Sequence, residues 1–210
     1  MLLGQLLKSV RKEYQSIRVR GISFDSRKIK RGDIFFAIKG NKTSGIKFIN
    51  KAISKGATAI ISNKKNNTKK YNIPIIVFKD VRKTLSEACS NFYKKKPNKI
   101  IAVTGTNGKS SVVNFFYQIL NLNKIPAASI GTLGIFSKNY SKKTNLTSID
   151  PLLLHKSLKI LKEKKSNKVI LEASSHGLEQ RRLDNLNINV GIFTNFSHDH
   201  LDYHKNMKSY

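Results

Sequence analysis

The sequence lacks several features on which particular classes of protein depend. Cys89 is the only cysteine, so neither an internal disulfide framework nor a zinc site of four thiolates can form. No apolar run approaches the length of a membrane-spanning helix, and the first residues carry neither the basic stretch nor the long apolar stretch of a secretory signal. We therefore expect a cytoplasmic protein with no membrane partner.

Acidic residues are also scarce: 12 aspartates and glutamates stand against 40 lysines and arginines, which gives a formal net charge of +28. Such a charge is typical of nucleic-acid-binding proteins. The lysines, however, are spread over every segment, and no aromatic-basic strand motif or helix-turn-helix pattern accompanies them. We favour a protein without a nucleic-acid partner, and a basic nucleic-acid-binding module stays an alternative. The charge would also attract an anionic nucleotide.

The most informative stretch is a short apolar run, residues 100–103, that leads through two glycines into a helical pattern starting at Ser110. Gly105 and Gly108 permit the backbone geometry in which several N–H groups point at one anion, and the helix N-terminus adds its positive dipole end. Lys109 would neutralise the β- and γ-phosphates, and the Ser110 hydroxyl would ligate Mg²⁺. The stretch therefore predicts a nucleotide-phosphate site between a strand and a helix.

Hydrophobic periodicity predicts an α/β fold of two domains. Residues 1–95 form a mixed α/β domain, and residues 96–210 form a parallel, doubly wound sheet around the phosphate-binding turn. Cys89 falls on the apolar face of a predicted helix, so we expect it in the core rather than as a nucleophile. Helices are predicted at the start of 1–17, over 46–55, from 81, over 110–120 and from a cap at Asp150-Pro151; strands over 19–24, 32–40, 57–62, 73–78, 100–103, 127–134, 168–172 and 188–194; and an irregular loop over 137–148.

Polar and ionisable side chains follow two of these strands. Glu172 begins the string Glu-Ala-Ser-Ser-His-Gly, and residues 194–204 read Thr-Asn-Phe-Ser-His-Asp-His-Leu-Asp-Tyr-His. Because the carboxyl ends of parallel strands meet at one edge of a sheet, both strings should lie beside Lys109. A carboxylate and an imidazole there can hold a magnesium ion that bridges ATP and a carboxylate substrate.

Two other interpretations of the second string stay open. Asp199 and Asp202 could cap a helix, with the histidines as surface residues. Alternatively, His198, Asp199, His200 and His204 could hold zinc in a metallohydrolase. The zinc interpretation leaves the phosphate-binding turn unexplained.

Three stretches, residues 105–111, 172–178 and 194–204, together resemble the ATP-dependent Mur ligases in order and spacing. The strings Ser-Ser-His-Gly-Leu and Asp-His-Leu-Asp-Tyr-His are similar to those of the Mur ligases that act on a UDP-N-acetylmuramoyl dipeptide and a diamino acid. Asp25-Ser-Arg27 and Gly32-Asp33 resemble the uridine-binding first domain of that family. Another Mur-type ligase or a folylpolyglutamate-type ligase stays an alternative.

The resemblance implies an ATP-dependent carbon–nitrogen ligase of cytoplasmic peptidoglycan precursor synthesis. Such an enzyme joins meso-diaminopimelate or L-lysine to UDP-N-acetylmuramoyl-L-Ala-D-Glu through an acyl phosphate, with ATP and Mg²⁺ as cofactors. The resemblance also implies a carbamylated lysine and a third domain beyond Tyr210. We therefore expect a monomeric N-terminal fragment that has no ligase activity by itself.

The resemblance further implies roles for individual residues. The catalytic residues would be Lys109, Glu172 and His200, and the magnesium ligands Ser110, Glu172 and His200. The ATP phosphates would be bound by Gly105, Thr106, Asn107, Gly108, Lys109, Ser110 and Ser111. The uridine diphosphate would be contacted by Phe24, Ser26, Asn41, Lys42 and Thr43, and the muramoyl dipeptide by Thr147, Ser148, Ser174, Gln180 and Arg182.

Overall fold

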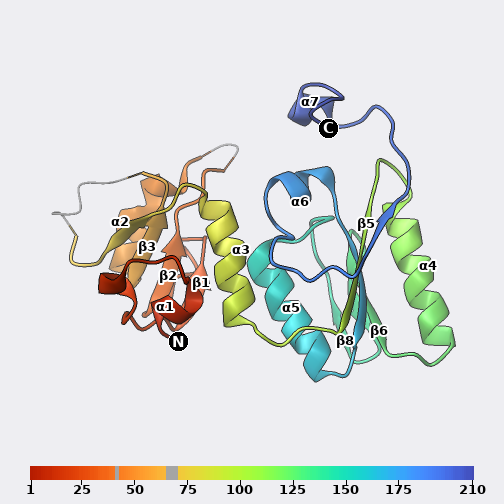
Figure 1. Ribbon diagram of the computed structural model, residues 1–210, viewed down its shortest axis with the longest axis horizontal. Coiled ribbons are helices and arrows are strands. Elements are labelled where there is room, and N and C mark those ends of the chain that lie inside the picture. Colours follow the sequence, from red (N-terminus) through yellow and green to blue (C-terminus); the bar gives the residue numbers. More distant parts are fainter. Residues whose placement is uncertain (41–42, 65–70) are drawn as a thin grey trace. The chain divides into compact units, whose positions relative to one another are not determined.

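The computed structural model describes residues 1–40, 43–64 and 71–210, and it divides into two compact units, Met1–Phe92 and Tyr93–Tyr210 (Figure 1). Each unit is built around its own β-sheet with helices packed on it. The expected α/β fold class is confirmed. In the described ranges, none of the helices combines the length and the apolar character that crossing a membrane requires.

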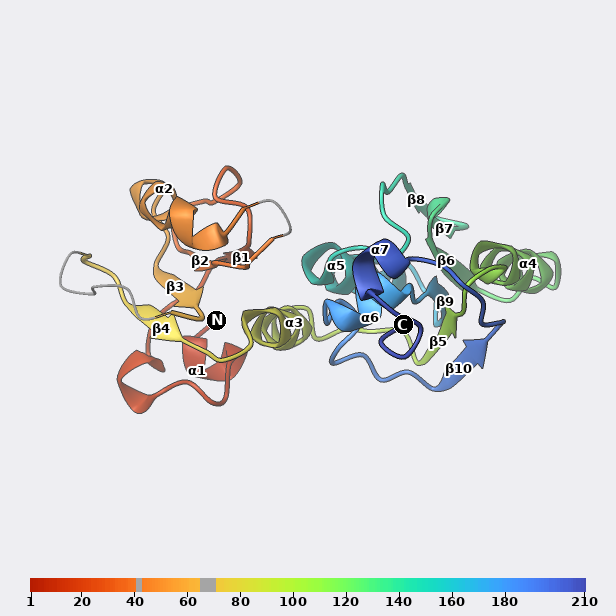
Figure 2. The same ribbon diagram turned by 90° about the horizontal axis from the view of Figure 1, so that it is seen from above.

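The first unit contains a parallel sheet whose described strands follow the order β1-β2-β3-β4. These strands are β1 (Gly21–Ser23), β2 (Asp33–Phe36), β3 (Ala59–Ser62) and β4 (Ile75–Val77). β2 and β3 are buried along their whole length, so both faces of the sheet need a cover. α2 (Ile49–Ser54) lies on one face, with α1 (Leu3–Leu6) and α3 (Val81–Phe92) on the other (Figure 2). Cys89 is fully buried, as predicted.

The helix predicted at the start of residues 1–17 is wrong in its extent, because α1 is a single turn and a short 3₁₀ helix, Lys12–Tyr14, follows it. The main chain here pairs with a returning segment instead of continuing a helix. The Leu3 N–H donates to the Ile17 carbonyl at 2.8 Å, and the Val19 N–H donates to the Met1 carbonyl at 2.8 Å. The helix predicted over 46–55 likewise begins as a 3₁₀ turn, Gly45–Phe48, before α2.

The second unit contains a sheet of strand order β10-β5-β9-β6-β7-β8. Its strands are β5 (Lys99–Thr104), β6 (Ala127–Gly131), β7 (Gly134–Ser137), β8 (Tyr140–Lys142), β9 (Lys168–Glu172) and β10 (Val190–Phe193). β10, β5, β9 and β6 are parallel. α4 (Lys109–Leu122) and α5 (Pro151–Glu163) cover opposite faces of this parallel part, as a doubly wound sheet requires (Figure 1).

Residues 127–148 differ from the strand predicted over 127–134 and the irregular loop predicted over 137–148, because they form three strands. The chain turns at Thr132-Leu133, so that Gly131 pairs with Gly134 and β7 runs back along β6 as an antiparallel strand. β8 then pairs with β7. Gly134 has a φ of +125°, which glycine adopts without strain, and the apolar residues on either side of the turn conceal it in the sequence.

Asp150 and Pro151 start α5 as predicted. The Asp150 carboxylate accepts a hydrogen bond from the Leu153 N–H at 2.9 Å, and Pro151 occupies the first turn, where its missing N–H costs nothing.

We expect the Asp150→Ala substitution to lower the free energy of unfolding by about 1 kcal/mol, because it leaves a first-turn N–H of α5 without its acceptor. Urea unfolding followed by circular dichroism measures this loss. The Asp150→Asn variant keeps a side-chain acceptor and is the control, expected to stay close to wild type. Equal stability of the alanine variant and wild type would contradict the assigned cap.

α5 also carries a buried histidine. The His155 side chain is 0% exposed, and neither ring nitrogen makes a hydrogen bond of good geometry among the described residues. A contact with the Asp184 main chain only partly opposes the effect of burial. Burial, together with the positive charge of Lys96, lowers the pKa of His155 to about 3. The imidazole is therefore neutral at pH 7 and throughout the mildly acidic range.

This burial predicts a pH dependence of stability. The pKa of a histidine in the unfolded chain is about 6.5, so the unfolded state takes up a proton that folded His155 rejects, and stability falls as the pH drops toward 3. Between pH 7 and pH 4 this residue should remove about 3 kcal/mol of stability. Urea unfolding at both pH values should show the His155→Leu variant losing less stability than wild type by about that amount. Parallel losses in the two proteins would refute this assignment.

Candidate active site

The turn between β5 and α4 has the geometry of an anion-binding loop. Gly108 is the N-cap of α4 with a φ of +82° and no side-chain cap, and Gly105 has a φ of +131°. The first helical bond runs from the Val112 N–H to the Gly108 carbonyl at 3.0 Å. No described hydrogen bond uses the N–H groups of residues 108–111, so these donors and the positive end of the helix dipole are available to an anion.

The predicted phosphate-binding lysine lies against this loop. The Lys109 ammonium donates to the Gly105 carbonyl at 2.6 Å and to the Thr106 carbonyl at 2.8 Å. An ammonium group has three N–H donors, so one direction is left for a further acceptor. The ammonium is thereby held beside the loop, where its third N–H group could donate to a phosphate oxygen.

Glu172 is the buried acidic centre of the site, because only 2% of its surface is exposed at the end of β9. Its Oε1 accepts from the Thr132 N–H at 2.8 Å, and its Oε2 accepts from the Ser110 hydroxyl at 3.0 Å and the Thr132 hydroxyl at 3.1 Å. A Cβ on Gly131 would collide with this carboxylate. Carboxylate and hydroxyl oxygens are the ligands that Mg²⁺ prefers, so Ser110 and Glu172 fit a magnesium ion.

The third predicted magnesium ligand lies in a different group of side chains. His200 is the N-cap of α7 (Leu201–His204), and its ring contacts His176 with centroids 4.7 Å apart. Its Nε2 lies 3.6 Å from the Asp199 carboxylate. No described contact joins His200 to Glu172 or Ser110.

Of the two other interpretations of residues 198–204, the surface interpretation holds in part, because His198 and His200 are exposed whereas His204 is buried. α7 has no side-chain cap, and the Asp199 carboxylate accepts from the neighbouring His200 N–H at 2.8 Å rather than from the first turn of the helix. In the part of the chain that the structure describes, no group of three or more histidine, cysteine, aspartate or glutamate side chains is arranged to hold a metal ion. The zinc interpretation therefore gains no support from the described residues.

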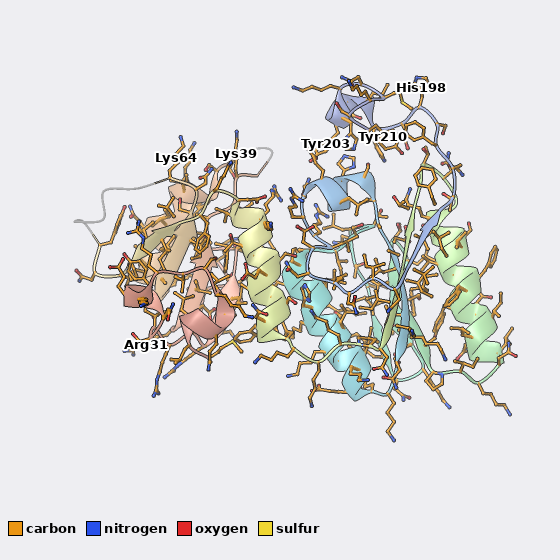
Figure 3. The ribbon with its side chains drawn as sticks, viewed as in Figure 1. Arg31, Lys39, Lys64, His198, Tyr203 and Tyr210 are labelled. Atoms are coloured by element: carbon orange, nitrogen blue, oxygen red, sulfur yellow. The ribbon has the colours of Figure 1, made fainter. Side chains whose placement is uncertain are left out.

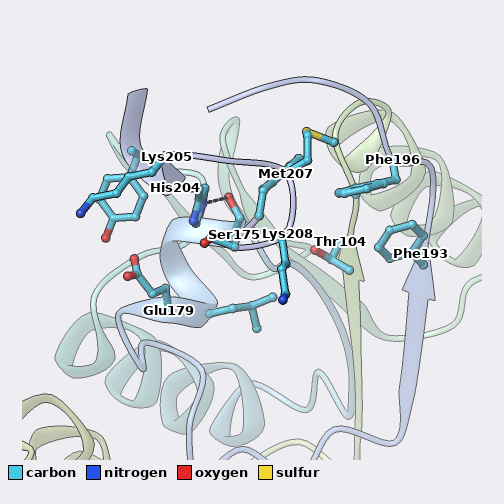
Figure 4. A pocket seen from close by; sticks show the side chains of 14 residues that line it. Thr104, Ser175, Glu179, Phe193, Phe196, His204, Lys205, Met207 and Lys208 are labelled. Atoms are coloured by element: carbon cyan, nitrogen blue, oxygen red, sulfur yellow. Dashed lines mark hydrogen bonds between the residues drawn. The ribbon is translucent and has the colours of Figure 1, made fainter. Parts of the chain in front are cut away.

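Residues 201–210 lie over α6 (Ser175–Glu179), where aromatic and histidine rings meet (Figure 3). The His176 ring lies 4.0 Å from the Tyr203 ring, and the His204 Nε2 is 2.9 Å from the Ser175 hydroxyl (Figure 4). Burial, followed by the charges of His200 and His204, lowers the pKa of His176. A cavity of about 810 Å³ lies under this segment, with Phe193, Phe196 and Lys208 among its lining residues (Figure 4).

The residues expected to grip the muramoyl dipeptide are brought together beside Glu172. The Ser148 hydroxyl donates to the Glu172 carbonyl at 2.9 Å and accepts from the Ser174 N–H at 2.8 Å. The Arg182 guanidinium donates to the Ser148 carbonyl at 2.5 Å and to the Gln180 side-chain oxygen at 2.8 Å. The Thr147 hydroxyl lies 3.0 Å from the Thr132 hydroxyl, which joins it to this network. Because the single Thr132 O–H proton is donated to Glu172, the Thr147 hydroxyl is the donor in this pair.

The expected uridine contacts lie in the first unit, in the segments that follow two neighbouring parallel strands. Phe24 follows β1 and is 37% exposed, whereas Ser26 is buried. Thr43 follows β2, and its carbonyl accepts from the Gly40 N–H at 2.9 Å. Asn41 and Lys42, the other two expected contacts, lie outside the described residues. Figure 3 shows Lys39 and Lys64 at the end of the unit where β2 and β3 finish, and Arg31 at the other.

Several residues that build the site have no role predicted from the sequence. Thr132, which donates twice to Glu172, lay within a predicted strand. The sequence offers Thr194 and Asn195 only as the start of the string 194–204, although both bond to Asn107 in the loop between β5 and α4. The glycines were the only local signal, because a side chain at Gly105 or Gly131 would collide with Thr194 or Glu172.

Comparisons with known proteins show which family the chain is similar to. A family profile described as the Mur ligase middle domain matches residues 103–210, and one described as the Mur ligase family catalytic domain matches residues 18–94. The chain is 42% identical over 198 residues to a protein of Brucella melitensis and 44% identical over 201 residues to one of Rickettsia montanensis. Both relatives are named UDP-N-acetylmuramoyl-L-alanyl-D-glutamate--2,6-diaminopimelate ligase. The alignments cover 94% of this chain but 41% and 42% of those relatives, so the chain spans about two fifths of their length.

Solved structures show the same relationship. One described as a UDP-N-acetylmuramoyl-L-alanyl-D-glutamate--2,6-diaminopimelate ligase matches with a TM-score of 0.85 and 31% identity, over 100% of this chain and 43% of its own. The MurF ligase of Thermotoga maritima, solved in complex with ADP, matches with a TM-score of 0.59 and 22% identity over 92% of this chain and 41% of its own, which supports the fold alone. Since the middle-domain profile spans more than half of the 210 residues, the chain belongs to the Mur ligase family.

Proposed function

We propose that this chain is the nucleotide- and dipeptide-binding part of an ATP-dependent ligase that joins 2,6-diaminopimelate to UDP-N-acetylmuramoyl-L-alanyl-D-glutamate in the cytoplasm. One observation supports this most directly: Glu172 belongs to two networks. Its carboxylate accepts from Ser110 at the phosphate-binding loop, and its main-chain carbonyl accepts from Ser148 of the expected dipeptide network. A terminal phosphate and a substrate carboxylate would therefore meet beside one residue. The relatives' names supply diaminopimelate as the amino acid.

The ATP phosphates would be bound by residues 105–111. The N–H groups of residues 108–111 would bind phosphate oxygens, and Lys109 would neutralise the charge that develops as the γ-phosphoryl group moves. Ser110 and Glu172 would hold Mg²⁺, which supplies charge neutralisation between the phosphates when bound. His200 contacts His176 in this structure, so it would join these ligands only after residues 198–204 rearrange.

The muramoyl dipeptide, whose carboxylate accepts the phosphoryl group, would be bound by the network around Ser148. Arg182 would fix the dipeptide so that the D-glutamate carboxylate faces the γ-phosphate. The carboxylate oxygen would attack phosphorus and release ADP, which leaves an acyl phosphate. The amine of the diamino acid would then attack the acyl carbon, and phosphate would leave as the amide forms. Residues of the first unit, Phe24, Ser26, Asn41, Lys42 and Thr43, would bind the uridine diphosphate.

The nucleotide site predicts that Lys109→Met weakens ATP binding by tenfold or more, because a charge-assisted contact to phosphate contributes about 1.5–3 kcal/mol. Isothermal titration calorimetry of the 210-residue chain with Mg²⁺-ATP measures the change. Lys156→Met, which removes the same charge from the exposed side of α5, is the control and should bind as wild type does. Equal affinities of the Lys109 variant and wild type for Mg²⁺-ATP would contradict the proposed role of Lys109 in phosphate binding.

We expect the chain to bind UDP-N-acetylmuramoyl-L-Ala-D-Glu saturably. The Arg182→Ala substitution should weaken this binding about tenfold, because it removes a charged donor and the hydrogen bonds to Ser148 and Gln180. Calorimetric titration tests this, with circular dichroism to verify folding. Arg11→Ala, at an arginine whose side chain is 83% exposed, controls for the change in net charge. A folded wild-type chain that does not bind this ligand would contradict the assigned substrate.

A further inference from the structure

The segment that follows β10 holds the tip of the phosphate-binding loop through a side-chain amide. The Asn195 Oδ1 accepts from the Asn107 N–H at 2.9 Å, and the Asn195 Nδ2 donates to the Asn107 carbonyl at 3.2 Å. The Thr194 hydroxyl donates to the same carbonyl at 2.6 Å. One side chain thus pairs with both polar groups of a single loop residue, as a neighbouring strand would.

The next loop residue is held by the same segment. The Thr106 N–H donates to the Asn195 carbonyl at 2.9 Å, and the Thr106 hydroxyl accepts from the Ser197 N–H at 2.9 Å. A Cβ on Gly105 would collide with the Thr194 hydroxyl, so the loop approaches this segment as closely as glycine permits. The β-ladder keeps the two segments together, because Phe193 of β10 pairs in register with Thr104 of β5, one residue before Thr194 and Gly105.

These contacts decide which loop donors can bind an anion. The N–H groups of Thr106 and Asn107 are directed at Asn195, whereas those of residues 108–111 have no acceptor in the described part of the chain. The Lys109 ammonium bonds the carbonyls of Gly105 and Thr106 and leaves that of Asn107 to Thr194 and Asn195. Without the Asn195 amide, the Asn107 peptide could rotate next to the flexible Gly108, and the donors would no longer be fixed in advance.

We propose that Asn195 is a positioning residue for nucleotide binding, which keeps the phosphate-binding loop in its anion-binding shape, and that Thr194 assists it. This inference rests on the proposed nucleotide site. Asn195 acts through the loop and not on the nucleotide base, so its loss should weaken every ligand that carries the phosphate chain.

The test compares wild type, Asn195→Ala and Thr194→Val, with Asn121→Ala at the exposed end of α4 as the matched control. Calorimetry with Mg²⁺-ATP and with Mg²⁺-tripolyphosphate measures affinity, and amide hydrogen exchange of Asn107 reports the state of the loop. We expect Asn195→Ala to weaken both ligands about tenfold, which corresponds to about 1.4 kcal/mol for two lost hydrogen bonds. Asn107 should also exchange faster in this variant, while exchange in β5 and the melting temperature stay near wild type.

Thr194→Val should show the same pattern with a smaller loss, about threefold, because one donor is removed. If Asn195→Ala fails to fold, the Thr194→Val variant still tests whether contacts from this segment keep the loop in its anion-binding shape. Unchanged affinity with accelerated Asn107 exchange would overturn the positioning role, and unchanged exchange would overturn the contact itself. If wild type binds neither ligand, the proposed nucleotide site fails, while the exchange measurement still tests whether Asn195 holds the loop.

Discussion

The buried carboxylate of Glu172 is the constraint on which the second unit depends. A carboxylate that is 2% exposed is stable only if hydrogen bonds replace the water it has lost. Its described donors come from Ser110 in the first turn of α4 and from Thr132 in the turn between β6 and β7. One side chain on β9 thereby fixes the start of a helix and a hairpin turn, and both flank the loop that could bind phosphate.

Close contacts at the carboxyl ends of the parallel strands explain two glycines that look unrelated in the sequence. Gly131 leaves room for the Glu172 carboxylate, and Gly105 leaves room for the Thr194 hydroxyl. Gly131 ends β6 against the Glu172 side chain of β9, and Gly105 follows β5 against the Thr194 side chain, which follows β10. These polar side chains lie in contact with the backbone of the two glycines. Glycine is therefore required at both positions because a Cβ would collide, in addition to its backbone freedom at Gly105.

The parts of the fold that were predictable carry strong local signals. The glycines before α4, the Asp150-Pro151 start of α5 and the apolar run that ends at Glu172 each specify their element from a few adjacent residues. The hairpin at Thr132 was missed because apolar residues continue through its turn. The contacts of Thr132 with Glu172 and of Asn195 with Asn107 join residues 40 and 88 positions apart, and no local pattern in one sequence encodes such a separation.

Strand register explains why so many contacts converge on one carboxylate. Val169 and Leu171 face the core under α5, and Ile170 faces the core under α4. Because side chains alternate along a strand, Glu172 must return to the α4 side, directly below the first turn of that helix. The neighbouring strands agree, since Ile170 of β9 pairs with Ile101 of β5 and both belong to the α4 core. A shift of one residue would place Leu171 beside Ser110 and force the carboxylate into the apolar core under α5, at a cost of several kcal/mol. The apolar packing and the hydrogen bonds of Glu172 therefore require the same register.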